Sequence, residues 1–477
     1  MGEMTRNHSS LTRQVVKALG IFGSLEGLNM LCAVLRSKLM ALWVGTAGVG
    51  VIALFNSTLE LMRTMTMFNL KQGGVREIAS APAAERPMVC HAVGRLALWL
   101  GLGGMVIVAM LSPLLSMAAF DTYDYTWAFA LLSLTMVASA IAEGRKTVLQ
   151  AMGQLKDLAK ASLYGAVTST VLSLPLVYFF RMQAIVPMLM VFSAFTLLFL
   201  MLPKTARPSR RPAPAYVRTK VRALVKLGSY LTAALLAGMG AEYALRIYLS
   251  LSSSVDTVGQ FQAGYVLINS YVGVIFTAIS MEFYPRLSAT IHRTRTTSVL
   301  VRHEINTMLW ILIPVVAVFI CTEELIVRIL YSEAFLPVLP FLSLAIMAMF
   351  FKAVSWCYSY VILAKGDGKV YVMTETLSAV CLVVFSYIGW SRWGFAGLGA
   401  AYLAQFIVFT LATWAVARHR YRLTIGRNIW LILLAGIAIA AVTFLAKHFL
   451  GPWLTLAIAL TLPVSYTHLT LPTICSV

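Results

Sequence analysis

Residues 94–118 read GRLALWLGLGGMVIVAMLSPLLSMA, with one charged residue, Arg95, near the start. An α-helix rises 1.5 Å per residue, so about 20 apolar residues cross the hydrocarbon core of a bilayer. This run is therefore long enough to span a membrane, and similar runs recur along the chain. The predicted spans cover residues 17–35, 41–62, 94–118, 126–144, 162–180, 184–203, 225–251, 258–281, 304–322, 337–363, 370–390, 397–417 and 429–447.

The composition excludes a soluble globular protein. Hydrophobic residues make up 60% and charged residues 12% of the 477 residues, and the mean hydropathy is +0.82. A soluble domain is about half apolar and a quarter charged, so lipid must act as the solvent for the excess. The sequence predicts an all-α polytopic membrane protein.

The basic residues indicate how the chain is oriented. Lys and Arg number 38 against 18 Asp and Glu, and cytoplasmic loops carry the excess of Lys and Arg. With a cytoplasmic N-terminus, 30 of the 38 fall in inward segments and six in outward ones, while Arg246 and Lys352 lie within spans. The predicted inward loops are 63–93, 145–161, 204–224, 282–303, 364–369 and 418–428. The positive charges lack the aromatic interleaving of a nucleic-acid groove, so no nucleic acid is expected.

The two halves of the chain resemble each other. Asn56-Ser57 recurs as Asn269-Ser270, and Ala151-Met152-Gly153 recurs as Ala364-Lys365-Gly366, both 213 residues later. Val16-Lys17 and the segment 44–48 recur at spacings of 209 and 211. Because each half holds six spans, the halves should be parallel repeats related by an axis along the membrane normal. The alternative is a chance likeness of glycine-bearing turns.

The predicted domains follow from this repeat. They are an N-terminal six-helix lobe (1–203), a basic linker (204–224), a C-terminal six-helix lobe (225–417) and an extra helix pair (418–463) whose last block, 452–463, is too short to cross. Residues 464–477 are expected to be a non-native tail, because Ser465-Tyr466-Thr467-His468-Leu469 onward resembles translated sequencing adapter.

Short motifs in a constant order resemble the bacterial O-antigen translocases, the Wzx-type flippases of the multidrug/oligosaccharidyl-lipid/polysaccharide exporter superfamily. The similarity covers roughly residues 11–450. Its motifs are Val16–Gly20, Arg36–Leu39, Val44–Gly50, Gly74–Glu77, Gly259–Tyr265, Tyr284–Ser288 and Ile329–Phe335. The resemblance implies two six-helix lobes and an extra helix pair. It also implies flipping of an undecaprenyl-diphosphate-linked oligosaccharide by alternating access in the bacterial inner membrane. Its expected partners are that lipid, the bilayer, a polysaccharide polymerase and a chain-length regulator.

Ionisable residues inside spans are costly and mark candidate sites. Arg246 lies one turn after Glu242 in the seventh span, close enough to pair, and Lys352 lies near the middle of the tenth. Glu26 lies at mid-depth in the first span, and Arg36 and Lys38 end it. We expect the four cations to bind the diphosphate and the two glutamates to carry protons or ions. Snorkelling to headgroups remains open for Arg36, Lys38 and Arg246, and a structural ion pair for Lys352.

Other polar residues give weaker signals. Glu60, Glu143 and Glu375 are expected at the cytoplasmic interface, because they lie near the ends of spans. The six cysteines are far apart, and neither they nor the histidines have a metal-ligand or triad spacing. No metal, no cofactor and no catalytic residue is therefore expected.

Three classes of function fit this pattern. The leading one is a lipid-linked oligosaccharide flippase. The second is a multidrug or cation antiporter of the same architecture, although the four cations would repel a cationic drug. The third is a membrane enzyme such as a polymerase or glycosyltransferase. It lacks support, because no outward loop is long enough to form a catalytic domain.

Overall fold

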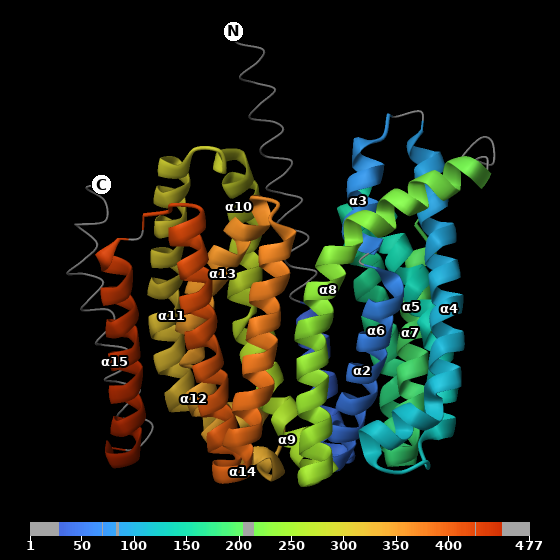
Figure 1. Ribbon diagram of the computed structural model, residues 1–477. Coiled ribbons are helices and arrows are strands. Elements are labelled where there is room, and N and C mark those ends of the chain that lie inside the picture. The colour runs from blue at the N-terminus through green and yellow to red at the C-terminus, as the bar shows by residue number, and fades with distance from the viewer. Residues whose placement is uncertain (1–27, 69, 83–84, 204–213, 425, 451–477) are drawn as a thin grey trace. The chain divides into compact units, whose positions relative to one another are not determined.

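The computed structural model describes residues 28–450 except 69, 83–84, 204–213 and 425, and within them the chain is helical with no β-strand. The chain divides into two compact units (Figure 1). Unit 1 comprises the described residues up to Leu236 together with Ser250–Val255, and unit 2 comprises Ala237–Leu249 and the described residues from Asp256 onward. Each unit is described separately.

Unit 1 begins with a helix over residues 28–43. Its other helices are α2 (Gly45–Met67), α3 (Leu70–Ser80), α4 (Arg86–Phe120), α5 (Thr126–Ala151), α6 (Leu155–Phe180), the 3-10 turn η1 (Arg181–Ala184) and α7 (Ile185–Met201). α4 and α5 run side by side (Figure 1). A Cβ atom at Gly101 would lie 2.7 Å from the Cβ of Ala140. Small residues at this contact let the backbones approach closely, as is usual between helices in membranes.

Unit 2 contains the Ala237–Leu249 part of α8 (Pro214–Ser252). It also contains α9 (Val255–Val266) from its second residue, Asp256, onward. Its other elements are the π-helical turn η2 (Leu267–Val272), α10 (Val274–Thr290), α11 (Thr294–Leu330), η3 (Glu333–Val338), α12 (Leu339–Ala345), α13 (Ala348–Ala364), α14 (Gly368–Ala415), η4 (Val416–Arg420) and α15 (Arg427–Leu450). α14 is two helices joined by a sharp turn at Gly394. α15 packs along α11 (Figure 1).

The expectation of a polytopic helical membrane protein is confirmed. Among the described residues, seven helices are long and apolar enough to cross a membrane, or eight if the bent pair of η3–α12 and α13 is one span. Two of these helical stretches, Leu155–Met201 and Gly368–Arg420, each contain two of the predicted spans. Together the eight account for ten of the thirteen predicted spans.

Two predicted boundaries are wrong. The first span was expected to end at residue 35, but the helix continues to residue 43 and breaks at Gly45, whose φ is +71°. Arg36 and Lys38 therefore lie within a helix and not in an outward loop. The seventh span was expected to begin at residue 225, but its helix, α8, begins at Pro214, inside the basic segment 204–224. Proline is favoured in the first turn of a helix, where its missing N–H is not needed.

Three other features were not predicted. The span 337–363 is bent by 55° between α12 and α13, and the span 258–281 is interrupted by the π-helical turn η2. A short helix, α3, forms in the predicted inward loop 63–93. Hydropathy measures how apolar a segment is, and it carries no information on where the backbone hydrogen bonds shift register.

Backbone conformation supports the internal repeat at a spacing of 213 residues. Gly153 and Gly366 both have φ +72°, and each follows a helix whose last carbonyls accept the same pattern of hydrogen bonds. Arg181 (φ 50°, ψ −123°) and Gly394 (φ 55°, ψ −132°) form the turns of the next helical hairpin in each half. Two turns of matching geometry at one spacing are hard to attribute to chance.

Some expectations fall outside the described residues. These are the first half of the first span, including Glu26, the short block 452–463, and the tail 464–477. The domain boundaries of the sequence analysis and the cytoplasmic location of the N-terminus remain predictions.

Candidate functional site

The candidate site lies in unit 2 and begins with an ion pair on α8. Arg246 Nη1 lies 3.4 Å from Glu242 Oε2, so the pair expected from the i,i+4 spacing forms. Arg246 is only 5% exposed, whereas the Glu242 side chain is 35% exposed. A buried guanidinium is tolerated only when its donors are satisfied, and α9 supplies the remaining partners.

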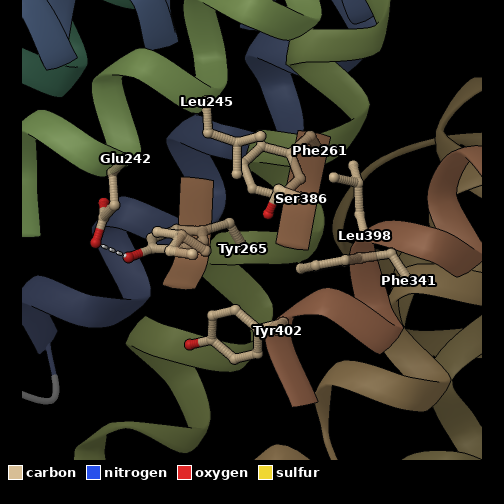
Figure 2. Close-up of a pocket in the computed structure, with 9 residues that line it drawn as sticks. Glu242, Leu245, Phe261, Tyr265, Phe341, Ser386, Leu398 and Tyr402 are labelled. Atoms are coloured by element: carbon tan, nitrogen blue, oxygen red, sulfur yellow. Dashed lines mark hydrogen bonds between the residues drawn. The ribbon is translucent and has the colours of Figure 1, made fainter. Parts of the chain in front are cut away.

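Two side chains of α9 complete the surroundings of this ion pair. Gln262 Oε1 accepts a hydrogen bond from Arg246 Nε at 3.1 Å. The hydroxyl of Tyr265 donates to Glu242 Oε1, and the Tyr265 ring lies 5.1 Å below the Arg246 guanidinium. Figure 2 shows the Glu242 carboxylate and the Tyr265 hydroxyl pointing toward each other. The Arg246 guanidinium is thus held by the charge of Glu242 and by a cation–π contact with the Tyr265 ring.

Asn269, in the turn η2, joins three helices. Its Oδ1 accepts hydrogen bonds from Lys352 Nζ of α13 at 2.7 Å and from Tyr402 Oη of α14 at 2.8 Å. Its Nδ2 donates to the Tyr265 carbonyl at 3.3 Å. A chain of hydrogen bonds therefore connects Lys352 to the Glu242–Arg246 pair through Asn269 and Tyr265. We call these side chains, with Tyr402 and Gln262, the unit 2 polar cluster.

Aromatic rings surround the second cation of the cluster. Lys352 Nζ lies 5.7 Å from the centre of the Phe276 ring and 5.5 Å from that of Phe406. The cavity beside the cluster is lined by Glu242, Leu245, Phe261, Tyr265, Phe341, Leu382, Ser386, Leu398 and Tyr402 (Figure 2). Its volume is about 10 Å³, which is enough for one water molecule at most. In this conformation the side chains of the cluster fill the space among themselves.

Unit 1 holds a larger cavity, which we call the unit 1 cavity. Its volume is about 260 Å³, close to the lower end of the roughly 300–1,000 Å³ typical of small-molecule sites. It is lined by residues of α2, α5 and α7: Asn56, Leu59, Glu60, Arg63, Thr135, Met136, Ser139, Ala142, Glu143, Lys146, Leu189, Phe192, Ser193 and Thr196. Arg63 pairs with Glu60, and Lys146 Nζ lies 3.7 Å from Glu143 Oε2.

Two further predicted site residues, Arg36 and Lys38, belong to unit 1. The Arg36 guanidinium lies 4.7 Å from the centre of the Phe192 ring, and Phe192 also lines the unit 1 cavity. Arg36 and Lys38 are both partly buried. The structure thus brings Glu242, Arg246 and Lys352 together in unit 2 and places Arg36 against α7 in unit 1.

The profile of the polysaccharide biosynthesis protein family matches residues 50–340. The chain belongs to this family. No curated protein sequence matches it.

Solved structures show which fold this member of the polysaccharide biosynthesis family adopts. The lipid II flippase MurJ in an inward closed conformation aligns with a TM-score of 0.73, at 12% identity over 95% of this chain and 99% of MurJ. An inward-facing multidrug resistance transporter of the MATE family, in the MOP superfamily, gives a TM-score of 0.69 at 13% identity, over 83% and 94% of the two chains. A MATE transporter from Vibrio cholerae gives 0.60 at 16% identity, over 87% and 100%. The fold is therefore that of the MOP superfamily.

Sequence reasoning missed four of the seven residues of the unit 2 polar cluster in this polysaccharide biosynthesis protein. Gln262, Tyr265, Asn269 and Tyr402 carry no charge, so nothing separates them from other polar residues of the spans. Glu60 and Glu143 both line the unit 1 cavity, a contact that sequence reasoning did not predict. The expectation that they lie at the membrane interface stays a prediction.

The described part of this family member contains no candidate metal site. No group of three or more His, Cys, Asp or Glu side chains lies close enough there to hold a metal ion. The five described cysteines are free thiols.

Proposed function

We propose that this protein is a flippase that moves an undecaprenyl-diphosphate-linked oligosaccharide from the inner to the outer leaflet of the bacterial inner membrane. The observation that supports it most is that two cations, Arg246 and Lys352, share one hydrogen-bonded cluster with a single carboxylate. Glu242 pairs with Arg246, whereas Lys352 is held by the uncharged Asn269. The cluster carries one net positive charge within a helical membrane unit. Membership of the polysaccharide biosynthesis family supports a substrate that belongs to polysaccharide synthesis.

A diphosphate needs such a cluster because its charges cannot enter hydrocarbon bare. Desolvating an unpaired ionised group costs many kcal/mol, so fixed cations must replace the lost water. Arginine offers two parallel N–H donors to a phosphate, and lysine offers a compact point charge. In the proposed mechanism, Arg246 and Lys352 bind the diphosphate while the polyprenyl chain stays in lipid, and Arg36 and Lys38 of unit 1 contribute further cations.

Release requires a competing anion, and Glu242 is adjacent. Glu242 Oε2 lies 3.4 Å from Arg246 Nη1, and Glu242 accepts a hydrogen bond from Tyr265. Binding of a phosphate would displace this carboxylate, and its return would displace the phosphate. Protonation of Glu242, or of Glu26 in the first span, is the proposed coupling step.

A cation or drug antiporter is the rival function, since MATE transporters share the fold. The polar cluster disfavours it, because Glu242 is already paired with Arg246 and hydrogen-bonded to Tyr265. A cationic drug would have to displace a buried guanidinium and then face Lys352.

We also propose that the chain has the predicted orientation, with a cytoplasmic N-terminus. A polysaccharide polymerase and a chain-length regulator are its proposed partners.

Complementation of a flippase-null strain, scored by surface polysaccharide, tests this proposal. Arg246→Ala and Lys352→Ala are each expected to abolish surface polysaccharide while protein level stays normal. Arg246→Lys should keep part of the activity, because it retains the charge but loses the two-pronged donor. Arg392→Ala is the matched control, since Arg392 is exposed at the turn of α14. Normal polysaccharide from the Arg246→Ala, Lys352→Ala double variant would refute the cationic site.

A further inference from the structure

The unit 1 cavity and the unit 2 polar cluster occupy equivalent positions of the internal repeat. Subtracting 213 from Asn269, Lys352 and Tyr402, the three residues joined at the centre of the cluster, gives Asn56, Ser139 and Leu189. All three line the unit 1 cavity. The matching turns at 153 and 366, and at 181 and 394, fix this spacing from the structure.

The side chains at equivalent positions differ in length between the two units. This difference explains why the polar cluster of unit 2 is filled and the cavity of unit 1 is open. In unit 2, the long side chains of Lys352 and Tyr402 converge on Asn269 and leave a cavity of about 10 Å³. In unit 1, Ser139 and Leu189 are shorter, and about 260 Å³ stays open. The same place in the fold is thus a closed cationic cluster in one unit and an open polar cavity in the other.

The lining of the unit 1 cavity is polar but has no net charge. Two carboxylates, Glu60 and Glu143, are matched by Arg63 and Lys146. Hydroxyl and amide groups complete the polar lining: Asn56, Thr135, Ser139, Ser193 and Thr196. Such a wall offers both donors and acceptors, and it attracts neither an anion nor a cation by its overall charge.

We propose that the unit 1 cavity binds the uncharged, polyhydroxylated sugar portion of the lipid-linked substrate. This inference rests on the proposed flippase function. A sugar hydroxyl both donates and accepts, so it can satisfy a carboxylate and a neighbouring cation together. Hydrogen bonds to charged groups are the stronger ones, which makes Glu60 and Glu143 the residues that determine which sugar is carried.

Binding to the purified full-length protein in lipid nanodiscs tests this assignment with two probes. One is the sugar-bearing undecaprenyl diphosphate extracted from a strain of the source organism that lacks this chain. The other is bare undecaprenyl diphosphate. The Glu60→Gln, Glu143→Gln double variant should bind the sugar-bearing lipid about tenfold more weakly. It should bind the bare lipid at least as well, because the change removes two negative charges and leaves Arg63 and Lys146 in place.

Two further variants separate the sugar contact from folding. Ser193→Phe fills the cavity without changing its charge, and it too should weaken only the sugar-bearing probe. Glu77→Gln, on α3 outside the cavity lining, is the matched control and should change neither. Equal loss of both probes in the double variant, or no loss of either, overturns the sugar site. If the wild-type protein binds neither lipid, the proposed function fails and this inference fails with it.

Discussion

A single uncharged residue, Asn269, holds a cation without neutralising it. Its amide oxygen accepts from Lys352 and from Tyr402 at once, which uses both lone pairs of that oxygen. An aspartate could accept the same two bonds, but its charge would cancel that of Lys352. The asparagine therefore keeps the ammonium in place and leaves its charge available for an anion.

A second residue, Asp367, gives a pH-dependent prediction. It accepts hydrogen bonds from Arg420 Nε at 2.7 Å and from Tyr421 Oη at 3.2 Å. Desolvation opposes ionisation, but the hydrogen bond and charge of Arg420 lower the pKa of Asp367 below its ordinary value. A carboxyl with a lowered pKa stabilises the fold above about pH 4, and that stability is lost as pH falls through the folded pKa.

Asp367→Asn should therefore lower the melting temperature at pH 7, by no more than about 2 °C, because exposed ion pairs contribute little. The difference from wild type should shrink toward pH 3.5. Tryptophan fluorescence during heating in detergent measures both values. A difference that is the same at the two pH values would contradict the assigned cause.

The sequence predicts the charged part of the site better than its uncharged part. Glu242 and Arg246 pair because i,i+4 neighbours share a helix face, a rule that needs no tertiary structure. Asn269 and Tyr402 lie 133 residues apart, and only the packing of three helices brings them together. The part of Glu60 in the unit 1 cavity was missed for the same reason, since the cavity forms only where α2, α5 and α7 meet.

At the scale of elements, the helix α15 is held to unit 2 by a buried charge. Lys447 Nζ donates to Glu323 Oε1 of α11 at 2.8 Å, and Ser343 Oγ of α12 donates to the same oxygen at 2.6 Å. The Glu323 side chain is only 2% exposed. Because a carboxylate at such a place must be paired, this ion pair connects the extra helix to the lobe.

Lys447→Ala should destabilise the protein by about 3–5 kcal/mol, since it leaves a buried carboxylate without its cation. The Glu323→Leu, Lys447→Met double variant should recover most of that loss, because it removes both charges. Chemical unfolding in detergent micelles, followed together with proteolysis near α15, measures the effect. Lys369→Ala, at an exposed position, is the control. A double variant less stable than Lys447→Ala would show that the two residues act independently.

Helix existence was easier to predict than helix ends. The apolar runs placed the described spans because length and hydropathy decide whether a segment can cross. The break after residue 43 was missed because Gly45, with φ +71°, ends the helix, while the nearby charges of Arg36 and Lys38 suggested an earlier end. The turn η2 was missed because a shift in backbone hydrogen bonding leaves no trace in composition.

At the scale of the whole molecule, the charge distribution predicts a topology that can be measured. In a chain freed of its native cysteines, Ser209→Cys should resist an impermeant thiol reagent added from outside, because the basic segment 204–224 is predicted to face inward. Asp121→Cys, at an exposed position between α4 and α5, should react. Labelling of the cysteine at 209 in intact cells would reverse the predicted orientation.

The internal repeat also lets each half be aligned with the other, as two homologous sequences are aligned. Arg181 adopts φ 50° and ψ −123°, a region nearly reserved for glycine, and its counterpart 213 residues later is Gly394. Such a conformation costs a non-glycine residue about 1–3 kcal/mol. The bond from Arg181 Nη1 to the Trp43 carbonyl, 2.8 Å long, returns about 0.5–1.5 kcal/mol.

Arg181→Gly should thus raise the melting temperature by about 1–2 °C. Heating the purified protein measures this change. A melting temperature below that of the wild type would mean that the bond to Trp43 outweighs the strain. Consensus engineering ordinarily needs many homologous sequences. A duplicated chain carries a small alignment within itself, and its own second half supplies the substitution for its first.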